Sequence, residues 1–174
     1  GNGIIKSDND IKFSDQNVVL ARLGVRIFLN KDLNHFNYLG RGPMENYADR
    51  KRGSDVGNYS STVMEQMTGY EKPMECGNHE DVRWANVTDA NGNGIGVRQS
   101  GDAHLQVSAL PYSDEQMRPV DYKIDLPKPD ATVLCVSHET LGVGSYGCGP
   151  RPLPQFIVHS KDATFSYEID LLNK

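Results

Sequence analysis

Residues 38–50 read YLGRGPMENYADR and hold two glycines, one proline, two arginines and two acidic residues in a short span. The glycines allow positive φ or a close approach of two backbones, and Pro43 fixes its own φ while it favours an extended Gly42. The two guanidinium groups can form forked ion pairs with carboxylates such as these two, which would tie the loop to itself or to a neighbouring strand. The sequence therefore predicts a rigid loop held by a structural clamp, in preference to substrate contacts, made of Arg41, Glu45, Asn46, Asp49 and Arg50.

Apolar and polar residues alternate over much of the rest of the chain, with the period of two that is typical of half-buried strands. The pattern covers residues 23–29, 105–109 and 165–171, and further extended segments are expected at 132–137 and 155–159. Many short strands with little helical pattern predict an all-β fold, an antiparallel β-sandwich.

Two local signals refine this expectation. The Asn-Gly repeats of residues 89–94 predict a hairpin that joins 82–87 to 95–98. Residues 113–117 predict one helical turn, with Ser113 as N-cap and Gln116 at the third helical position.

The composition excludes several classes of function. The net charge of −5 and the scattered 18 lysines and arginines argue against a nucleic-acid partner. No apolar run approaches the roughly 18 residues that cross a bilayer, so no membrane partner is expected. The three cysteines form no C-x-x-C pair and the five histidines no H-x-x-x-H motif, so no metal site is indicated.

The N-terminal segment differs in composition from the remainder of the chain. Residues 1–17 are polar and rich in Asn and Asp, which predicts either a frayed end or a strand that continues an upstream domain. Residues 18–174 are expected to form one β domain.

Four segments in order carry a resemblance to a known family. They are residues 38–50, preceded by VLARLGVRIFL (19–29) and followed by PMECGNHEDVRWANVTDANGNGIGV (73–97) and LQVSALPYSDEQM (105–117). Together they resemble the C-terminal β domain of glycoside hydrolase family 2 β-galactosidases over residues 18–170. The resemblance implies part of a supersandwich similar to the galactose mutarotase fold.

The resemblance also implies where the chemistry takes place. Family members cleave terminal β-D-galactosides such as lactose with retention, using two carboxyls on a separate (β/α)₈ barrel that needs ~250 residues. We therefore expect no catalytic residue in this chain and no activity from it alone. Structural roles are favoured over catalysis for each of the five acidic residues Glu45, Asp49, Glu75, Glu80 and Asp81.

The partners and cofactors follow from the same resemblance. The galactoside substrate would be shared with the barrel, the other domains of the parent chain would pack nearby, and the parent would be a homo-oligomer. Mg²⁺ and Na⁺ are implied near the barrel of the parent, whereas this chain shows no ligand cluster for either and is expected to hold no cofactor.

One loop of the family's domain carries a tryptophan that stacks on the leaving-group side of the sugar. The matching loop here is residues 142–150, where Cys148 takes the tryptophan's place and Tyr146 is the only aromatic residue. A cysteine offers much less apolar area than an indole, so we expect Tyr146 to substitute in part. For Cys148 an inert small side chain is favoured over a reactive thiol.

Three further residues have two interpretations each. Glu75 and His79 lie in a Gly/Asn-rich segment and either face the sugar pocket or cap strands and turns. Trp84, the only tryptophan, alternates with Val82 and Asn86 as on one face of a strand, and it is expected to be a core anchor in preference to a sugar platform.

Two functions of other classes stay open as alternatives. One is a stand-alone carbohydrate-binding module with an open sheet face lined by tyrosines. The other is a mutarotase-like sugar epimerase with Glu75 and His79 as acid and base, which 174 residues make the weaker alternative because a complete supersandwich is larger.

Overall fold

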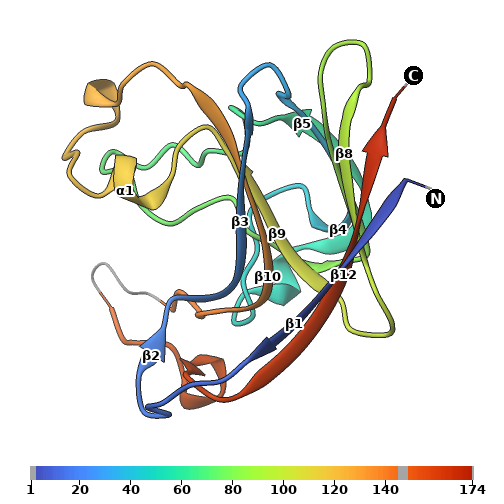
Figure 1. Ribbon diagram of the computed structural model, residues 1–174. Helices are drawn as coiled ribbons and strands as arrows, with labels where there is room; N and C mark the ends of the chain where they lie inside the picture. Colours follow the sequence, from blue (N-terminus) through green and yellow to red (C-terminus); the bar gives the residue numbers. More distant parts are fainter. Residues whose placement is uncertain (1–2, 145–148, 174) are drawn as a thin grey trace.

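Two antiparallel sheets pack face to face in the computed structural model, which describes residues 3–144 and 149–173 (Figure 1). The larger sheet has the order β1-β12-β8-β7-β4-β5 and the smaller one β3-β10-β9-β6, with a separate β11-β2 pair. All described pairs are antiparallel, which confirms the predicted all-β class.

The strands of the larger sheet are β1 (Ile4–Ile11), β12 (Ala163–Leu172), β8 (Gly94–Gln99), β7 (Trp84–Thr88), β4 (His35–Gly42) and β5 (Asp55–Thr62). Those of the smaller sheet are β3 (Arg22–Asn30), β10 (Ala131–Thr140), β9 (Leu105–Leu110) and β6 (His79–Val82), and the separate pair is β2 (Val19–Leu20) with β11 (Val158–His159). Within the described part of the chain, helical structure is limited to α1 (Asp114–Met117) and three 3₁₀ turns, Lys51–Gly53, Lys123–Asp125 and Pro154–Phe156. No helix in the described ranges has the length and apolar character that a bilayer span requires.

The core lies between the two sheets. Phe36, Tyr38 and Tyr167 are fully buried from the larger sheet, and Val107 and Leu134 are fully buried from the smaller one. The predicted alternation of residues 105–109 is confirmed, because the odd positions face this core. Burial of these apolar and aromatic side chains is the main stabilising contribution that the sandwich offers.

The predicted hairpin and helical turn are both present. Strands β7 and β8 pair across a turn in which the Asp89 carboxylate accepts the amides of Asn91 and Asn93 and Gly92 has φ +84°. The amide of Ser113 donates to the Gln116 side chain at the start of α1.

The strand predicted at 155–159 is wrong over its first half. Pro154–Phe156 form a 3₁₀ turn, in which the Phe156 amide donates to Leu153 O at 2.9 Å. Only Val158–His159 pair, with β2. The proline suits the first position of a helical turn because it has no amide hydrogen to place.

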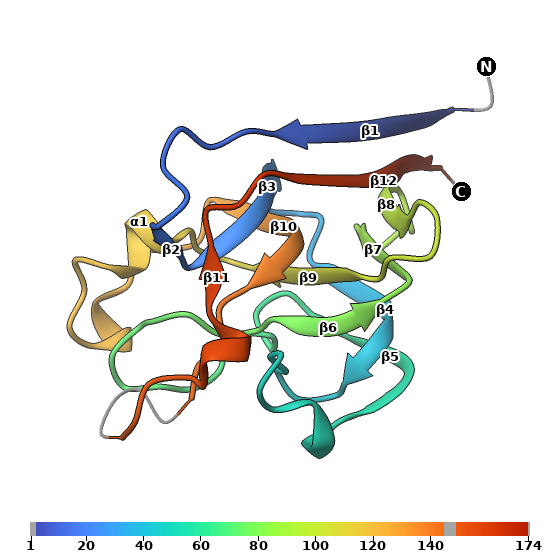
Figure 2. The same ribbon diagram turned by 90° about the horizontal axis from the view of Figure 1, so that it is seen from below.

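Strand β1 settles how residues 4–11 are arranged. It pairs with β12 from Ile4 opposite Asp170 to Ile11 opposite Ala163, so the strand alternative for the N-terminal segment is favoured over the frayed end. Figure 2 shows the two ends of the chain side by side at one edge of the sheet.

The glycines of the 38–50 segment serve close packing. Neither has positive φ. A Cβ on Gly40 would lie 2.7 Å from Val82 Cγ2, and one on Gly42 would overlap the Tyr38 hydroxyl and lie 2.7 Å from the Tyr59 ring. Of the two reasons proposed for these glycines, close approach is the one that the structure shows.

The prediction that Trp84 is a core anchor is wrong. Ala85 and Val87 are the core residues of β7, so Trp84 points to the outer face of the larger sheet and is only half-buried. Val82 does face the core, but it belongs to β6 in the smaller sheet. The chain changes sheets between Val82 and Trp84, which resets the alternation that the sequence pattern assumed.

Candidate functional site

A cavity of about 510 Å³ lies where one end of β10 meets the loops that follow β4 and β5. Its lining comes from four separate parts of the sequence: Ala21; Tyr47 and Arg50; Tyr70, Met74 and Glu75; and Thr140 to Gly144. The YLGRGPMENYADR segment and the glycine-rich segment after β10 therefore share one site.

Asp49 joins these two segments. Its carboxylate accepts the backbone amides of Val143, at 3.2 Å, and Gly144, at 2.5 Å. Gly144 has φ +53°, which favours glycine, and the Gly142 amide donates to Phe156 O at 2.9 Å. Two successive amides that point at one carboxylate fix the course of the backbone along the cavity wall.

Glu45 connects the loop after β5 to the YLGRGPMENYADR segment. Its side chain is almost fully buried and accepts bonds from Thr68 Oγ1 and Tyr70 Oη, both at 2.7 Å, and from the Gly77 amide at 2.9 Å. Arg50 Nη2 lies 3.3 Å from the same carboxylate. The bond to Glu45, together with burial, raises the pKa of Tyr70, so this tyrosine stays a neutral donor.

Glu75 faces the cavity but is already bound. Both of its oxygens accept from Arg22 Nη2, at 2.8 and 2.9 Å, and Oε1 also accepts from Tyr47 Oη at 3.0 Å. Burial, and next the Glu75 charge, raise the pKa of Tyr47. The group is an ion pair with an added tyrosine donor, which presents a fixed polar edge to the cavity.

His79 does not join Glu75. It is fully buried, its Nδ1 lies 2.9 Å from Arg41 O and its Nε2 contacts the Gln66 side chain. Its ring centroid also lies 4.1 Å from that of Tyr38, and burial lowers its pKa to about 4. Both nitrogens are thus engaged inside the core, so the acid–base pair that an epimerase would need is not assembled.

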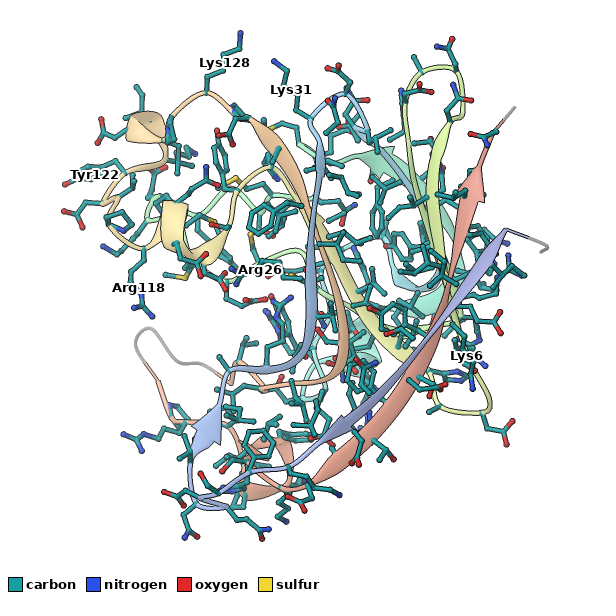
Figure 3. The ribbon with its side chains drawn as sticks, viewed as in Figure 1. Lys6, Arg26, Lys31, Arg118, Tyr122 and Lys128 are labelled. Atoms are coloured by element: carbon teal, nitrogen blue, oxygen red, sulfur yellow. The ribbon has the colours of Figure 1, made fainter. Side chains whose placement is uncertain are left out.

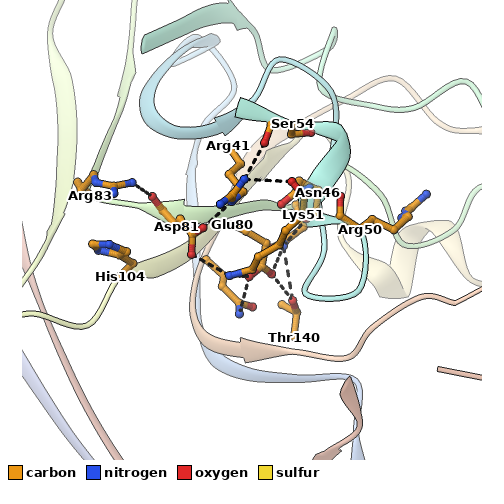
Figure 4. Close-up of polar contacts among 12 residues, drawn as sticks. Arg41, Asn46, Arg50, Lys51, Ser54, Glu80, Asp81, Arg83, His104 and Thr140 are labelled. Atoms are coloured by element: carbon orange, nitrogen blue, oxygen red, sulfur yellow. Dashed lines mark hydrogen bonds and ion pairs between the residues drawn. The ribbon is translucent and has the colours of Figure 1, made fainter. Parts of the chain in front are cut away.

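The remaining members of the predicted clamp also form polar contacts (Figure 4). Arg41 pairs with Asp81, at 2.5 Å from Nε to Oδ2, and donates to the carbonyls of Lys51 and Ser54. Asn46 donates its side-chain amide to Arg50 O at 2.8 Å. Both predicted uses of the two arginines are found: Arg41 ties the loop to a neighbouring strand, because Asp81 belongs to β6, and Arg50 ties the loop to itself through Glu45.

Glu80 lies behind the cavity. Its carboxylate is buried, 3.3 Å from Lys51 Nζ and bonded to Thr140 Oγ1 at 3.3 Å and Gln106 Nε2 at 3.2 Å. Burial raises its pKa, and Lys51 opposes that change. Of the five acidic residues Glu45, Asp49, Glu75, Glu80 and Asp81, Glu75 alone lines the described cavity.

Two of the three cysteines lie in the described part of the chain. Cys76 and Cys135 are buried free thiols, and burial raises the pKa of Cys76 to about 12. Tyr146 and Cys148 lie outside the described residues, so their predicted contact with the sugar stays a prediction. Across residues 3–144 and 149–173 no three His, Cys, Asp or Glu side chains gather as a metal site.

Sequence reasoning missed several residues of the cavity, among them Arg22, Tyr70 and Met74. Arg22 belongs to a quoted strand segment, but nothing in its spacing indicates a partner 53 positions away. Tyr70 and Met74 lie in a loop without periodicity. Only their contacts with distant segments identify them.

Curated relatives of this chain are β-galactosidases. That of Priestia megaterium is 34% identical over 142 residues, which cover 82% of this chain and 14% of the relative. The β-galactosidase BgaC of Bifidobacterium adolescentis is 33% identical over 87% of this chain and 14% of its own length. The β-galactosidase of Lactobacillus delbrueckii subsp. bulgaricus is 31% identical over 163 residues, which cover 94% of this chain and 16% of the relative.

The chain thus spans only 14–16% of the length of these relatives, and its segments correspond to one portion of much longer proteins. The family model for the β-galactosidase small chain matches residues 2–171, nearly the whole sequence. With this match and these identities, the chain belongs to the β-galactosidase small chain family.

Proposed function

We propose that this chain is the C-terminal domain of a family 2 β-galactosidase and forms one wall of its sugar pocket. The parent would hydrolyse terminal β-D-galactosides such as lactose with retention, using two carboxyls on a barrel that is not part of this sequence. The two sheets would be part of a larger mutarotase-like supersandwich. The Mg²⁺ and Na⁺ implied for the parent would bind near the barrel.

One observation carries this proposal: the anchoring of Gly144 and Val143 by Asp49. It brings the glycine-rich segment, which resembles the family's substrate loop, against a cavity of about 510 Å³. The cavity offers apolar wall from Met74 and a fixed polar edge from Glu75. Sugar pockets combine these two kinds of surface, because a pyranose has apolar C–H faces and hydroxyl edges.

The same contacts argue against chemistry within the chain. Retaining hydrolysis needs two carboxyls roughly 5 Å apart, one of them free to donate a proton. Glu75 is the one carboxyl among the described residues that line the cavity, and it is bound to Arg22 and Tyr47. The domain therefore shapes a pocket whose reacting groups lie elsewhere.

Met74 provides the test in a full-length β-galactosidase that carries this chain. Its side chain is exposed, so Met74→Ala removes cavity wall without disturbing the core. We expect the KM for lactose to rise about fourfold, the effect of losing roughly one buried methylene. The rate constant for cleaving an activated galactoside with a small leaving group should not change.

Met64 is the matched control. It is similarly exposed and lies outside the cavity, so Met64→Ala should leave both constants unchanged. An unchanged KM for lactose in both variants would overturn the proposed wall.

A further inference from the structure

A second hollow, of about 470 Å³, lies on the outer face of the larger sheet, away from the core. It is centred on β7, β8 and the end of β12, and its lining includes Trp84, Asn86, Gly96, Arg98 and Asp170. The strand register explains its shape. In the strand register Gly96 lies between Asn86 of β7 and Asp170 of β12. Because glycine has no side chain, the backbone at this position forms the floor of the hollow.

The side chains around this floor are held in place. Arg98 forms an ion pair with Asp170, whose carboxylate is only 14% exposed. A Cβ on Gly96 would lie 2.7 Å from Asn86 Oδ1, so only glycine lets that amide reach over the strand. Among the described residues no side-chain hydrogen bond engages the Asn86 amide, which leaves its donors and acceptor free for a ligand.

Trp84 forms the apolar part of the site. It lies opposite Arg98 in the register and is half-buried, so part of its indole is open to the hollow. Each neighbouring strand contributes an outward side chain to the hollow, so apolar and polar groups lie within a few ångströms of one another. An indole beside an amide and a carboxylate is suited to a ring with one C–H face and several hydroxyls.

The surroundings favour a small neutral ligand over another protein domain. Along this face most of the neighbouring outward residues are polar, namely Asn37, Asn58, Ser60 and Glu168, with Leu39 opposite Trp84 and Leu172 in the lining as apolar ones, and protein interfaces are depleted of charge at their centre. The positive charge of Arg98 is offset by Asp170. Arg83 also lines the hollow and donates to the Asp81 carbonyl, so its guanidinium is a further hydrogen-bond donor beside the ion pair.

We propose that this hollow is a second carbohydrate-binding site, which takes a neutral pyranoside such as a galactoside with its C–H face on Trp84. The sugar hydroxyls would bond to Asn86 and to the Arg98–Asp170 pair. The proposal does not depend on the role proposed for the cavity at Asp49, because the two sites share no lining residue.

The single tryptophan makes the test direct, because all indole fluorescence of the 174-residue chain comes from Trp84. Titration with lactose or methyl β-galactoside should change this emission saturably, with a dissociation constant in the millimolar range. In Asp170→Asn, which removes the carboxylate and its ion pair, the constant should rise about tenfold. Trp84→Phe, followed by calorimetry, should bind measurably but more weakly.

Two controls make the result specific. Glu168→Gln lies on the same strand and face but outside the lining, and Glu75→Gln alters the other cavity; both should titrate like the unchanged chain. A response to glycerol as large as that to lactose, or no response at the solubility limit of the sugar, would overturn the proposal. An emission that shifts only with chain concentration would make the hollow a protein contact and overturn it too.

Discussion

His79 is a histidine whose charged form the fold excludes. Burial lowers its pKa from 6.5 to about 4, and both ring nitrogens are engaged inside the core. Well above pH 6.5 the ring is neutral in both the folded and the unfolded chain, so its titration does not change the free energy of unfolding. Below pH 6.5 only the unfolded chain binds the proton, so the free energy of unfolding should fall until about pH 4.

The expected loss between pH 7 and pH 5 is about 2 kcal/mol, measured by urea denaturation. The neighbouring Glu80, whose pKa burial raises above 4.5, gives an effect of opposite sign as the pH falls toward 4.5. Comparison with His79→Gln isolates the histidine, because Glu80 is present in both chains. Identical pH profiles for the two chains would contradict this account.

Gly42 is a position where one methyl group should be costly. A Cβ there would overlap the Tyr38 hydroxyl and press on the Tyr59 ring, both in the packed sheet. We expect Gly42→Ala to lower the free energy of unfolding by about 1–3 kcal/mol. Gly53, whose Cβ would meet nothing within 4 Å, gives the matched control, and Gly53→Ala should unfold at the same denaturant concentration as the parent chain.

Among the larger elements, Asp49 links the loop after β4 to the segment after β10. In Asp49→Asn one of the two accepting oxygens becomes a donor that faces an amide hydrogen. We expect hydrogen exchange at Val143 and Gly144 to accelerate and the free energy of unfolding to fall by about 1–2 kcal/mol. Asp102→Asn, at an exposed position, should change neither quantity.

Sequence periodicity was a good guide to single elements and a poor one to their boundaries. It predicted the strands 105–109 and 165–171 and the hairpin at 89–94, because each stays in one sheet and keeps one face buried. It failed at Trp84, where the chain changes sheets. It also failed at Pro154, where a 3₁₀ turn interrupts an apolar run.

The candidate site was harder to predict than the fold. A Gly/Asn-rich context pointed to Glu75 and the family resemblance pointed to the loop of residues 142–150, but neither could tell that Glu75 meets Arg22 or that His79 turns into the core. Such pairings depend on contacts between residues far apart in the chain. The local sequence propensity of a segment does not encode these long-range contacts.

For the molecule as a whole, the domain is expected to be a scaffold without chemistry of its own. No described pair of carboxyls faces the cavity, because Glu75 is its only acidic lining residue. The purified 174-residue chain should therefore show no galactoside hydrolysis in an assay of released galactose. Robust cleavage that survives removal of contaminating host enzyme would contradict this.

The edge position of β1 and its antiparallel pairing with β12 set how the chain responds to tension. Ile4 lies opposite Asp170, so a pull on the two ends loads the ladder at a single rung (Figure 3 shows Lys6 beside this edge). Bonds at that rung carry the load before the others share it. Strands β1 and β12 should therefore separate one residue pair at a time under weak force, while β7, β4 and the smaller sheet remain intact.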